Sequence, residues 1–317
     1  EHAIAALAAG KHVLIDKPMA TSVEECVAIE RASRKFGRVA MVGPSHGFAP
    51  PIAQARELIR SGAYGSVRLI TAFNFTDFMF RPRRPSELDS ASGGGVVFSQ
   101  AAHQIDIVRR LTERPVSSVR ASALNWDASR PSEGAYTAML SFEGGAVASL
   151  TYSGYAHYDS DELLGWVSEL GYAKDPSGYG GARRSLAAMS PAQELDAKLA
   201  RTLSHRSQAD SQRPAHHEHF GFIMVCCDHA DIKIGPTGVT VYADDTRDVF
   251  PSKPTTPSRY DAIDSFIAAI DGTPTAQDIS WDVRTIACCV ALLESSRLAS
   301  DVSPEALIAE VQKGPSQ

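Results

Sequence analysis

The stretch GKHVLIDKP, residues 10–18, decides how the first part of the chain folds. Its centre, Val13–Ile15, is a short continuous apolar run, which is typical of a strand buried on both faces of a parallel sheet. Residues 1–9 carry apolar side chains at helical spacing, and Gly10 is a natural residue to end that helix. The stretch therefore predicts a helix that leads directly into a buried parallel strand.

The residues that follow repeat this pattern. Ser22 and Glu25 have the spacing of a capping box, which predicts the start of a second helix, and Gly37 predicts its end. Residues 39–42 predict a second buried strand. A strand, a helix and a second strand in this order form a parallel crossover, so we expect the first part of the chain to be α/β.

The rest of the chain has a different pattern. The predicted strands cover residues 67–75, 116–126, 136–142, 146–152, 220–226, 231–234 and 239–242. Several are joined by short turns, such as the glycine turn at 143–145, which indicates an antiparallel sheet, so we expect this part to be α+β. Helical patterns cover residues 51–61, 101–111, 263–270 and 281–298. Residues 159–215 are polar and lack a strong strand pattern, which predicts a helical or loop-like insertion.

The composition excludes several classes of protein. With 317 residues, two domains are expected at roughly 150 residues each. The net charge of −6 disfavours nucleic acid as a partner, and no apolar run approaches the length that would make a membrane a partner. The five cysteines are Cys26, Cys226, Cys227, Cys288 and Cys289. They form no disulfide framework of a secreted protein, so we expect a cytoplasmic location.

Lys17 is the first candidate for chemistry. It follows the strand of residues 13–15 at the edge where open α/β sheets place ligands, between Asp16 and Pro18. A lysine in this position can orient a substrate hydroxyl and share its proton, and Pro18 can fix a tight turn, including one with a cis bond. The alternative is a surface lysine after a strand.

Several motifs resemble one family. The stretch at residues 10–18 resembles the GKHVxxEKP signature of the glucose-fructose oxidoreductase, inositol dehydrogenase and MocA (Gfo/Idh/MocA) family. Three glycines at 93–95 precede His103 and Asp106, similar to the family's glycine-rich helix start, and residues 234–238 resemble its late hairpin. The resemblance covers most of the chain except the insertion.

The resemblance implies a fold and a cofactor. Residues 1–44 would form the C-terminal part of a Rossmann dinucleotide-binding domain. Residues 45–317 would form an α+β substrate domain with an open antiparallel sheet, its C-terminal helices packing back toward the Rossmann part. The cofactor would be NAD or NADP. Because no Gly-x-Gly-x-x-Gly loop occurs in the sequence, we expect that loop upstream of Glu1 and the sequence to be N-terminally truncated.

His103 is the second candidate. Histidine titrates near neutral pH and can take a proton, although a histidine packed at a helix start is the alternative. The resemblance makes His103 the catalytic histidine, with Lys17. The family commonly has Asp four residues earlier, where this sequence has Ser99, beside Gln100. We expect Ser99 and Gln100 to contact substrate.

The resemblance also extends to the cofactor side. Asp16 replaces the family's usual Glu, and Asp16, Lys17 and Pro18 are expected to bind the cofactor. Asp106 matches the family, and we expect it to be structural.

A third candidate is the proline-stiffened loop RPRRP at residues 81–85. Arginine forks bind carboxylates bidentately, so Arg81, Arg83 and Arg84 are predicted to bind substrate, against the alternative of a solvated basic loop. His46 stands where the family often has Arg and is predicted to contact substrate as well.

Other polar clusters favour packing over function. Tyr152, Tyr155, His157 and Tyr158 could wall a ring-shaped substrate, but aromatic strand ends usually pack in a core. His217 and His219 could share one face of a strand, yet no second ligand pair stands at zinc spacing, so no metal is expected. The pair at residues 288–289 is predicted to be buried packing.

We therefore predict an NAD(P)-dependent oxidoreductase that takes a hydride from a substrate carbinol. The glycine-rich helix start, the arginine loop and the residues after the insertion resemble the branch that degrades aromatic acids, with phthalate 4,5-cis-dihydrodiol as the expected substrate. The alternatives are a sugar or inositol dehydrogenase of the same family and a non-catalytic cofactor-sensing regulator. The expected partners are a small-molecule substrate, such as an aromatic dicarboxylate diol, and further copies of the chain, through the open sheet.

Overall fold

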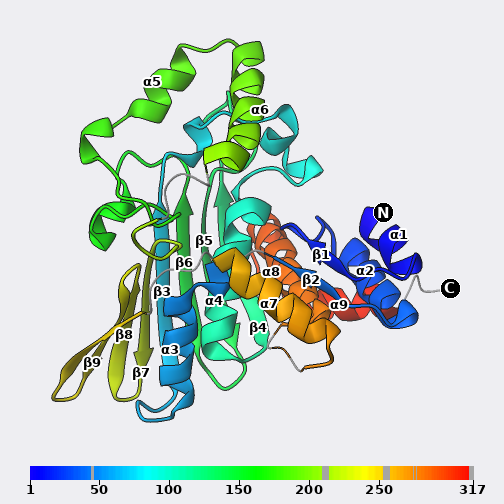
Figure 1. Cartoon of the computed structure of the whole chain (residues 1–317), viewed down its shortest axis with the longest axis vertical. Coiled ribbons are helices and arrows are strands. Elements are labelled where there is room, and N and C mark those ends of the chain that lie inside the picture. The colour runs from blue at the N-terminus through cyan, green and yellow to red at the C-terminus, as the bar shows by residue number, and fades with distance from the viewer. Residues whose placement is uncertain (44–45, 209–213, 253–257, 274, 276, 314–317) are drawn as a thin grey trace.

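The computed structural model of the chain describes residues 1–43, 46–208, 214–252, 258–273, 275 and 277–313. Figure 1 shows a large sheet on one side, a small pair of strands on the other, and helix α8 between them. The expected combination of an α/β part and a sheet-based α+β part is confirmed.

The small unit is the predicted parallel crossover. Its elements are α1 (His2–Ala8), β1 (Val13–Ile15), α2 (Val23–Phe36) and β2 (Ala40–Val42). The two strands pair in parallel. The backbone N–H of Glu25 donates to the hydroxyl of Ser22 over 3.2 Å, and Gly37 ends α2 with a φ of 58°. Both predicted ends of the helix are confirmed.

The large sheet has eight strands in the order β10-β9-β8-β7-β3-β6-β5-β4. Their bounds are Val67–Phe75 (β3), Val116–Leu124 (β4), Ala135–Phe142 (β5), Val147–Ser153 (β6), Phe222–Cys227 (β7), Ala230–Gly235 (β8), Gly238–Ala243 (β9) and Arg247–Pro251 (β10). The sheet is antiparallel, as expected, except at one place, where β3 and β6 pair in parallel. The chain leaves β3, crosses over through helix α4 (Ala102–Thr112) to the far edge, and returns through β5, which leaves β6 running alongside β3.

Some elements differ from those expected. A π-helical turn, Val97–Ala101, precedes α4, and the strand predicted to reach Trp126 stops at Leu124. Strand β10 and helix α9 (Pro304–Lys313) were not predicted. β10 is exposed over most of its length, so it carries no alternating apolar pattern.

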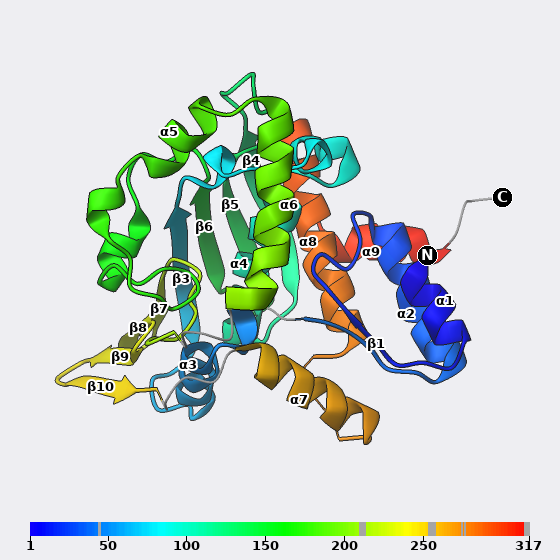
Figure 2. The ribbon, with the colours of Figure 1, turned by 45° about the horizontal axis from the view of Figure 1, so that its top comes forward.

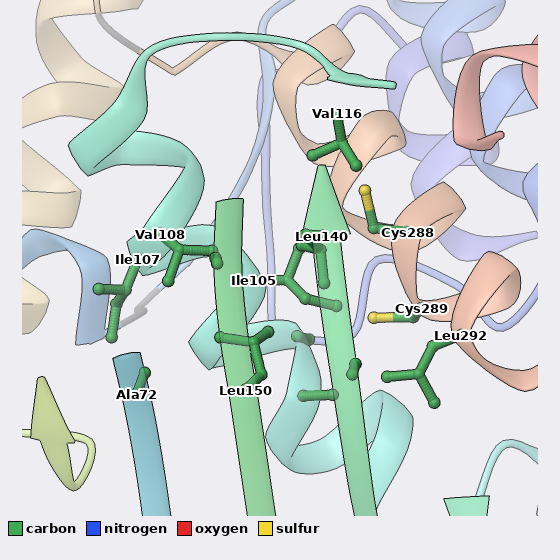
Figure 3. Packing of buried hydrophobic residues seen from close by; sticks show 14 of the residues in the cluster. Ala72, Ile105, Ile107, Val108, Val116, Leu140, Leu150, Cys288, Cys289 and Leu292 are labelled. Carbon is green, nitrogen blue, oxygen red and sulfur yellow. The ribbon is translucent and has the colours of Figure 1, made fainter. Parts of the chain in front are cut away.

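Helix α8 (Ile279–Leu298) holds the two units together. It packs against β4 on one side and against α2 on the other, and α9 packs on both α8 and α2. Figure 3 shows Cys288, Cys289 and Leu292 of α8 pointing toward the core beside Val116 and Leu140. Both cysteines are buried, which confirms the packing role predicted for them.

The same helix protects the free edge of the sheet. The hydroxyl of Ser295 accepts a hydrogen bond from the backbone N–H of Ala121 over 2.9 Å, and that of Ser296 accepts one from Ala123 over 2.8 Å. These side chains satisfy strand donors that would otherwise be open to pairing with another chain.

Residues 159–215 form the predicted helical insertion. Its helices include α5 (Gly181–Ala187) and α6 (Pro191–Gln208), which arch over the large sheet in Figure 2; residues 209–213 of the insertion lie outside the described residues. Glu194 of α6 pairs with the buried Arg130 over 2.6 Å. The insertion is therefore fixed to the sheet domain.

None of the helices in the described ranges combines the length and the apolar character that a membrane span requires.

A buried polar cluster joins α4 to the start of α8. Arg110 donates to Asp106 over 2.9 Å and also bonds Gln277, and the indole of Trp281 donates to Asp106 over 2.7 Å. Gln277 in turn donates to Asp282 over 2.6 Å. Asp106 thus has the structural contacts expected of it.

We expect Arg110→Met to lower the free energy of unfolding by about 3–5 kcal/mol, because it removes a buried cation and leaves buried carboxyl groups behind. Urea unfolding followed by circular dichroism measures this loss. The matched control is Arg297→Met, which breaks a solvent-exposed pair with Glu294 on α8 and should cost less than about 1 kcal/mol. Equal losses in the two variants would contradict the role given to the cluster.

Candidate active site

Lys17 lies directly after β1, and its peptide bond to Pro18 is cis. The ammonium group donates to the backbone carbonyl of Ser99 over 3.0 Å. Burial lowers the pKa of Lys17, against the nearby charges of Asp16 and Glu169, which raise it. A lysine with a lowered pKa is a better proton acceptor near neutral pH than an ordinary lysine.

The carbonyl that Lys17 contacts is presented by the π-helical turn. Gly95, which precedes this turn, has a φ of 83°, and a Cβ there would overlap the carboxylate of Glu133. The backbone carbonyl of Glu133 accepts a hydrogen bond from the N–H of Val96, and its carboxylate accepts one from the N–H of Val97. The hydroxyl of Ser99 donates back to the carbonyl of Gly95. Ser99 therefore contacts Lys17 through its backbone, and its side chain bonds the turn.

His103 stands in the first turn of α4, and its side chain is buried. Its ring packs edge-on against His46, with centroids 4.8 Å apart, and lies 5.0 Å from the ring of Phe220. Burial lowers the pKa of His103 well below its ordinary value, and the charges of Lys17 and His46 lower it further. The imidazole is therefore neutral at physiological pH, with a ring nitrogen that can accept a hydrogen bond or a proton, although burial makes it a weaker base than an ordinary histidine.

A cavity of about 30 Å³ joins these residues to the small parallel unit. It is lined by Lys17, Pro18, Met19, Val42, Ala102, His103, Asp106, Gln277, Asp282, Thr285 and Ile286. Lys17 and Val42 lie at the carboxyl ends of β1 and β2, the edge at which open α/β sheets bind nucleotides. A cavity of this volume holds about one water molecule. The apolar side chains of Pro18, Met19 and Val42 in its lining are the surface against which the nicotinamide ring of a dinucleotide would pack. Asp16 is exposed at the same strand end.

The three arginines of the predicted binding loop separate in space. Arg81 donates to Asp77 over 2.9 Å, and its Nη1 lies 3.9 Å from a carboxylate oxygen of Glu169. Arg83 stacks on the ring of Phe78, 3.4 Å from its centroid, and its charge is close enough to Lys17 to lower the pKa of that lysine. Arg84 is exposed, and its backbone N–H donates to the carboxylate of Glu87 over 2.8 Å.

The remaining predicted substrate contacts lie near His103. His46 begins a single helical turn, His46–Phe48, and its Nδ1 is 3.9 Å from Glu218. Burial lowers the pKa of His46, while the charges of Glu218 and Glu169 raise it. Gln100 is buried in the π-helical turn.

Two residues of this site were not found by sequence reasoning. Glu169 belongs to the insertion, and its carboxylate accepts a hydrogen bond from the side chain of Asn74 over 2.7 Å. Phe220 packs against both His46 and His103. Glu169 stands in no motif. Phe220 stands in the stretch after the insertion that carries part of the resemblance, but no site role was predicted for it. Only the folded chain brings these two residues to the site.

The other polar clusters pack in the structure. Tyr152 and Tyr155 are buried, whereas His157 and Tyr158 are exposed, so these four residues form no common wall. A ring nitrogen of His219 bonds the backbone carbonyl of Val167 over 2.8 Å, and residues 216–219 are not in a strand. Among the described residues no group of three or more His, Cys, Asp or Glu side chains could hold a metal ion.

Comparisons with known proteins agree with this geometry. Residues 1–44 match the model of the oxidoreductase family with an NAD-binding Rossmann fold, and residues 52–167 match that of the Gfo/Idh/MocA C-terminal domain. The chain is 40% identical over 302 residues to 1-carboxy-3-chloro-3,4-dihydroxycyclohexa-1,5-diene dehydrogenase of Comamonas testosteroni, covering 93% of this chain and 76% of that protein. The chain belongs to the Gfo/Idh/MocA family of NAD-binding oxidoreductases.

Solved structures show the same fold. A Bordetella bronchiseptica RB50 protein assigned as a dehydrogenase superposes with a TM-score of 0.88 at 37% identity, over 95% of this chain and 79% of that one. Levoglucosan dehydrogenase in complex with NADH and levoglucosan superposes with a TM-score of 0.68 at 18% identity, over 95% of this chain and 75% of that one. The family and fold predicted from residues 10–18 are confirmed, and so is the nicotinamide cofactor.

Proposed function

We propose that this oxidoreductase oxidises one hydroxyl of a cyclic cis-diol that carries a carboxylate, with Lys17 and His103 as the proton-accepting pair. The observation that carries the proposal is the shared cavity at the ends of β1 and β2, where a lysine and a histidine with lowered pKa values stand side by side. The Comamonas testosteroni relative, named for a carboxylated dihydroxycyclohexadiene, supports this class of substrate.

The residues of the chain position the substrate and manage its proton. Lys17, held by the carbonyl of Ser99, orients the reacting hydroxyl, and Lys17 or the neutral ring of His103 accepts its proton. A bound nicotinamide would supply the acceptor for the hydride that leaves the same carbon, so that an alcohol and NAD⁺ give a ketone, NADH and a proton. Pro18 and Val42 would hold the nicotinamide ring through apolar contacts.

The product explains why a diol on an unsaturated ring suits this reaction. Oxidation of one carbinol of a cyclohexadiene diol gives a ketone that tautomerises to a catechol. The gain of aromaticity shifts the equilibrium of the oxidation toward product, whatever the protein contributes.

The proposal is tested with a panel of substrates and the absorbance of reduced nicotinamide. Wild-type protein should oxidise a carboxylated cyclohexadiene cis-diol with a higher kcat/KM than inositol or levoglucosan. Faster turnover of a sugar or an inositol would replace the diol by that alternative class of substrate. The alternative is supported by a levoglucosan dehydrogenase of Pseudarthrobacter phenanthrenivorans, which is 33% identical to this chain over 134 residues. That match covers 41% of this chain and 34% of that protein.

We expect Arg83→Ala to raise KM for the carboxylated diol about 10- to 100-fold, because a hydrogen bond to a charged group contributes about 1.5–3 kcal/mol. The KM for an uncharged polyol should change little. Arg84→Ala is the matched control, since this arginine of the same loop is exposed. A similar rise in KM for charged and uncharged substrates would remove the carboxylate contact from the proposal.

A further inference from the structure

The insertion delivers one carboxylate, that of Glu169, to the proposed site. One of its oxygens accepts the hydrogen bond from Asn74 at the end of β3. Its backbone carbonyl accepts a hydrogen bond from the N–H of His219 over 3.2 Å, next to Phe220 in the chain. Two segments of the sheet domain therefore hold Glu169, one by its side chain and the other by its backbone.

Glu169 is ionised and keeps the capacity to accept a further hydrogen bond. Burial works against its charge, but Arg81, His46 and the bond from Asn74 outweigh it and hold the pKa of Glu169 below its usual range. The second oxygen lies 3.9 Å from Arg81, which is longer than a hydrogen bond. The side chain remains 21% exposed, so a ligand can reach it.

The carboxylate also lies beside the proposed proton-accepting pair. His219, whose N–H bonds the carbonyl of Glu169, is followed in the chain by Phe220, and Phe220 packs against the rings of His46 and His103. The charge of Glu169 acts on Lys17 and on His46. An ionised carboxylate accepts hydrogen bonds and cannot donate them, so its natural partner in a substrate is a hydroxyl.

We propose that Glu169 determines specificity for a diol by accepting a hydrogen bond from the hydroxyl that does not react, while the neighbouring hydroxyl reacts at Lys17 and His103. This inference rests on the proposed function. The bond is charge-assisted and therefore about twice as strong as a neutral one. A substrate that lacks the second hydroxyl leaves the partly buried carboxylate without that donor, which disfavours its binding.

The test compares a carboxylated cyclic cis-diol with the matched mono-alcohol. Glu169→Gln should lower the ratio of kcat/KM for the diol to kcat/KM for the mono-alcohol about 10-fold, and Glu169→Ala should lower it about 100-fold. This ratio cancels the effect of the lost charge on Lys17, which both substrates share. Glu162→Gln is the matched control, because it neutralises another carboxylate of the insertion, one that is exposed. It should leave the preference for the diol unchanged.

Equal losses for the two substrates would show that Glu169 only supports the fold, and would overturn the inference. The same conclusion would follow if Glu162→Gln also abolished the preference. Calorimetric binding of the diol and the mono-alcohol provides a readout that needs no turnover. Suppose that the wild-type protein binds the diol more tightly than the mono-alcohol, that Glu169→Gln loses this preference, and that the wild-type protein does not oxidise the diol. This result would sustain the inference about Glu169 and overturn the proposed reaction.

Discussion

Lys17→Met should lower kcat by a factor of about 100 to 10,000, the range in which a positioned acid–base group contributes to catalysis. Wild-type kcat/KM should rise with pH through the pKa of Lys17, because only the neutral amine accepts a proton. Since burial lowers that pKa, the rise should fall at lower pH than for an ordinary lysine. In the variant this rise should disappear. Initial rates measured over a range of pH check both statements.

Two further variants isolate the proton transfer. Lys17→Arg keeps a positive charge but cannot give up its proton near neutral pH, so it should be nearly as inactive as Lys17→Met. Lys11→Met removes an exposed lysine of the same stretch and should retain wild-type activity. If Lys17→Arg kept most of the activity, Lys17 would act through its charge, and its role as a base would be wrong.

His103→Ala should lower kcat on the order of 100-fold with a smaller change in KM. The reason is that the ring is proposed to help take up the proton that leaves the reacting hydroxyl in the transition state. His103→Asn keeps a polar side chain beside His46 and Phe220 and should be impaired to a similar degree. Steady-state kinetics with the diol measures both variants.

The control for this prediction is His157→Ala, which removes an exposed histidine. It should behave as wild type. A loss in His103→Ala that appears only in KM would assign His103 to substrate binding.

The parts of the fold that could be predicted follow from local patterns. The parallel crossover at residues 13–42 has continuous apolar strands and a capped helix, and every one of these signals is local. The parallel pairing of β3 and β6 could not be read from the sequence, because it depends on where the chain returns after α4. Helix α9 also falls outside the sequence prediction, which ended with α8 at residue 298.

The site divides in the same way. Lys17 and His103 stand in a stretch and a helix start that the sequence identifies, and the structure brings both to one cavity. The arginine loop shows the limit of such reasoning, since its three arginines have one local pattern but three different surroundings. Glu169 lies in a polar insertion without a motif, so only tertiary contacts with Asn74 and Arg81 single it out.

The position of α8 has a consequence for how the protein is made. The carboxylate of Asp282 accepts a hydrogen bond from the N–H of Val42, 240 residues earlier in the chain. Helix α2 packs against α1 and β2, which lie close to it in the sequence, and against α8, so its contact with α8 can form only after most of the chain has been synthesised. The parallel unit therefore completes its folding late, although its residues are made before those of the large sheet.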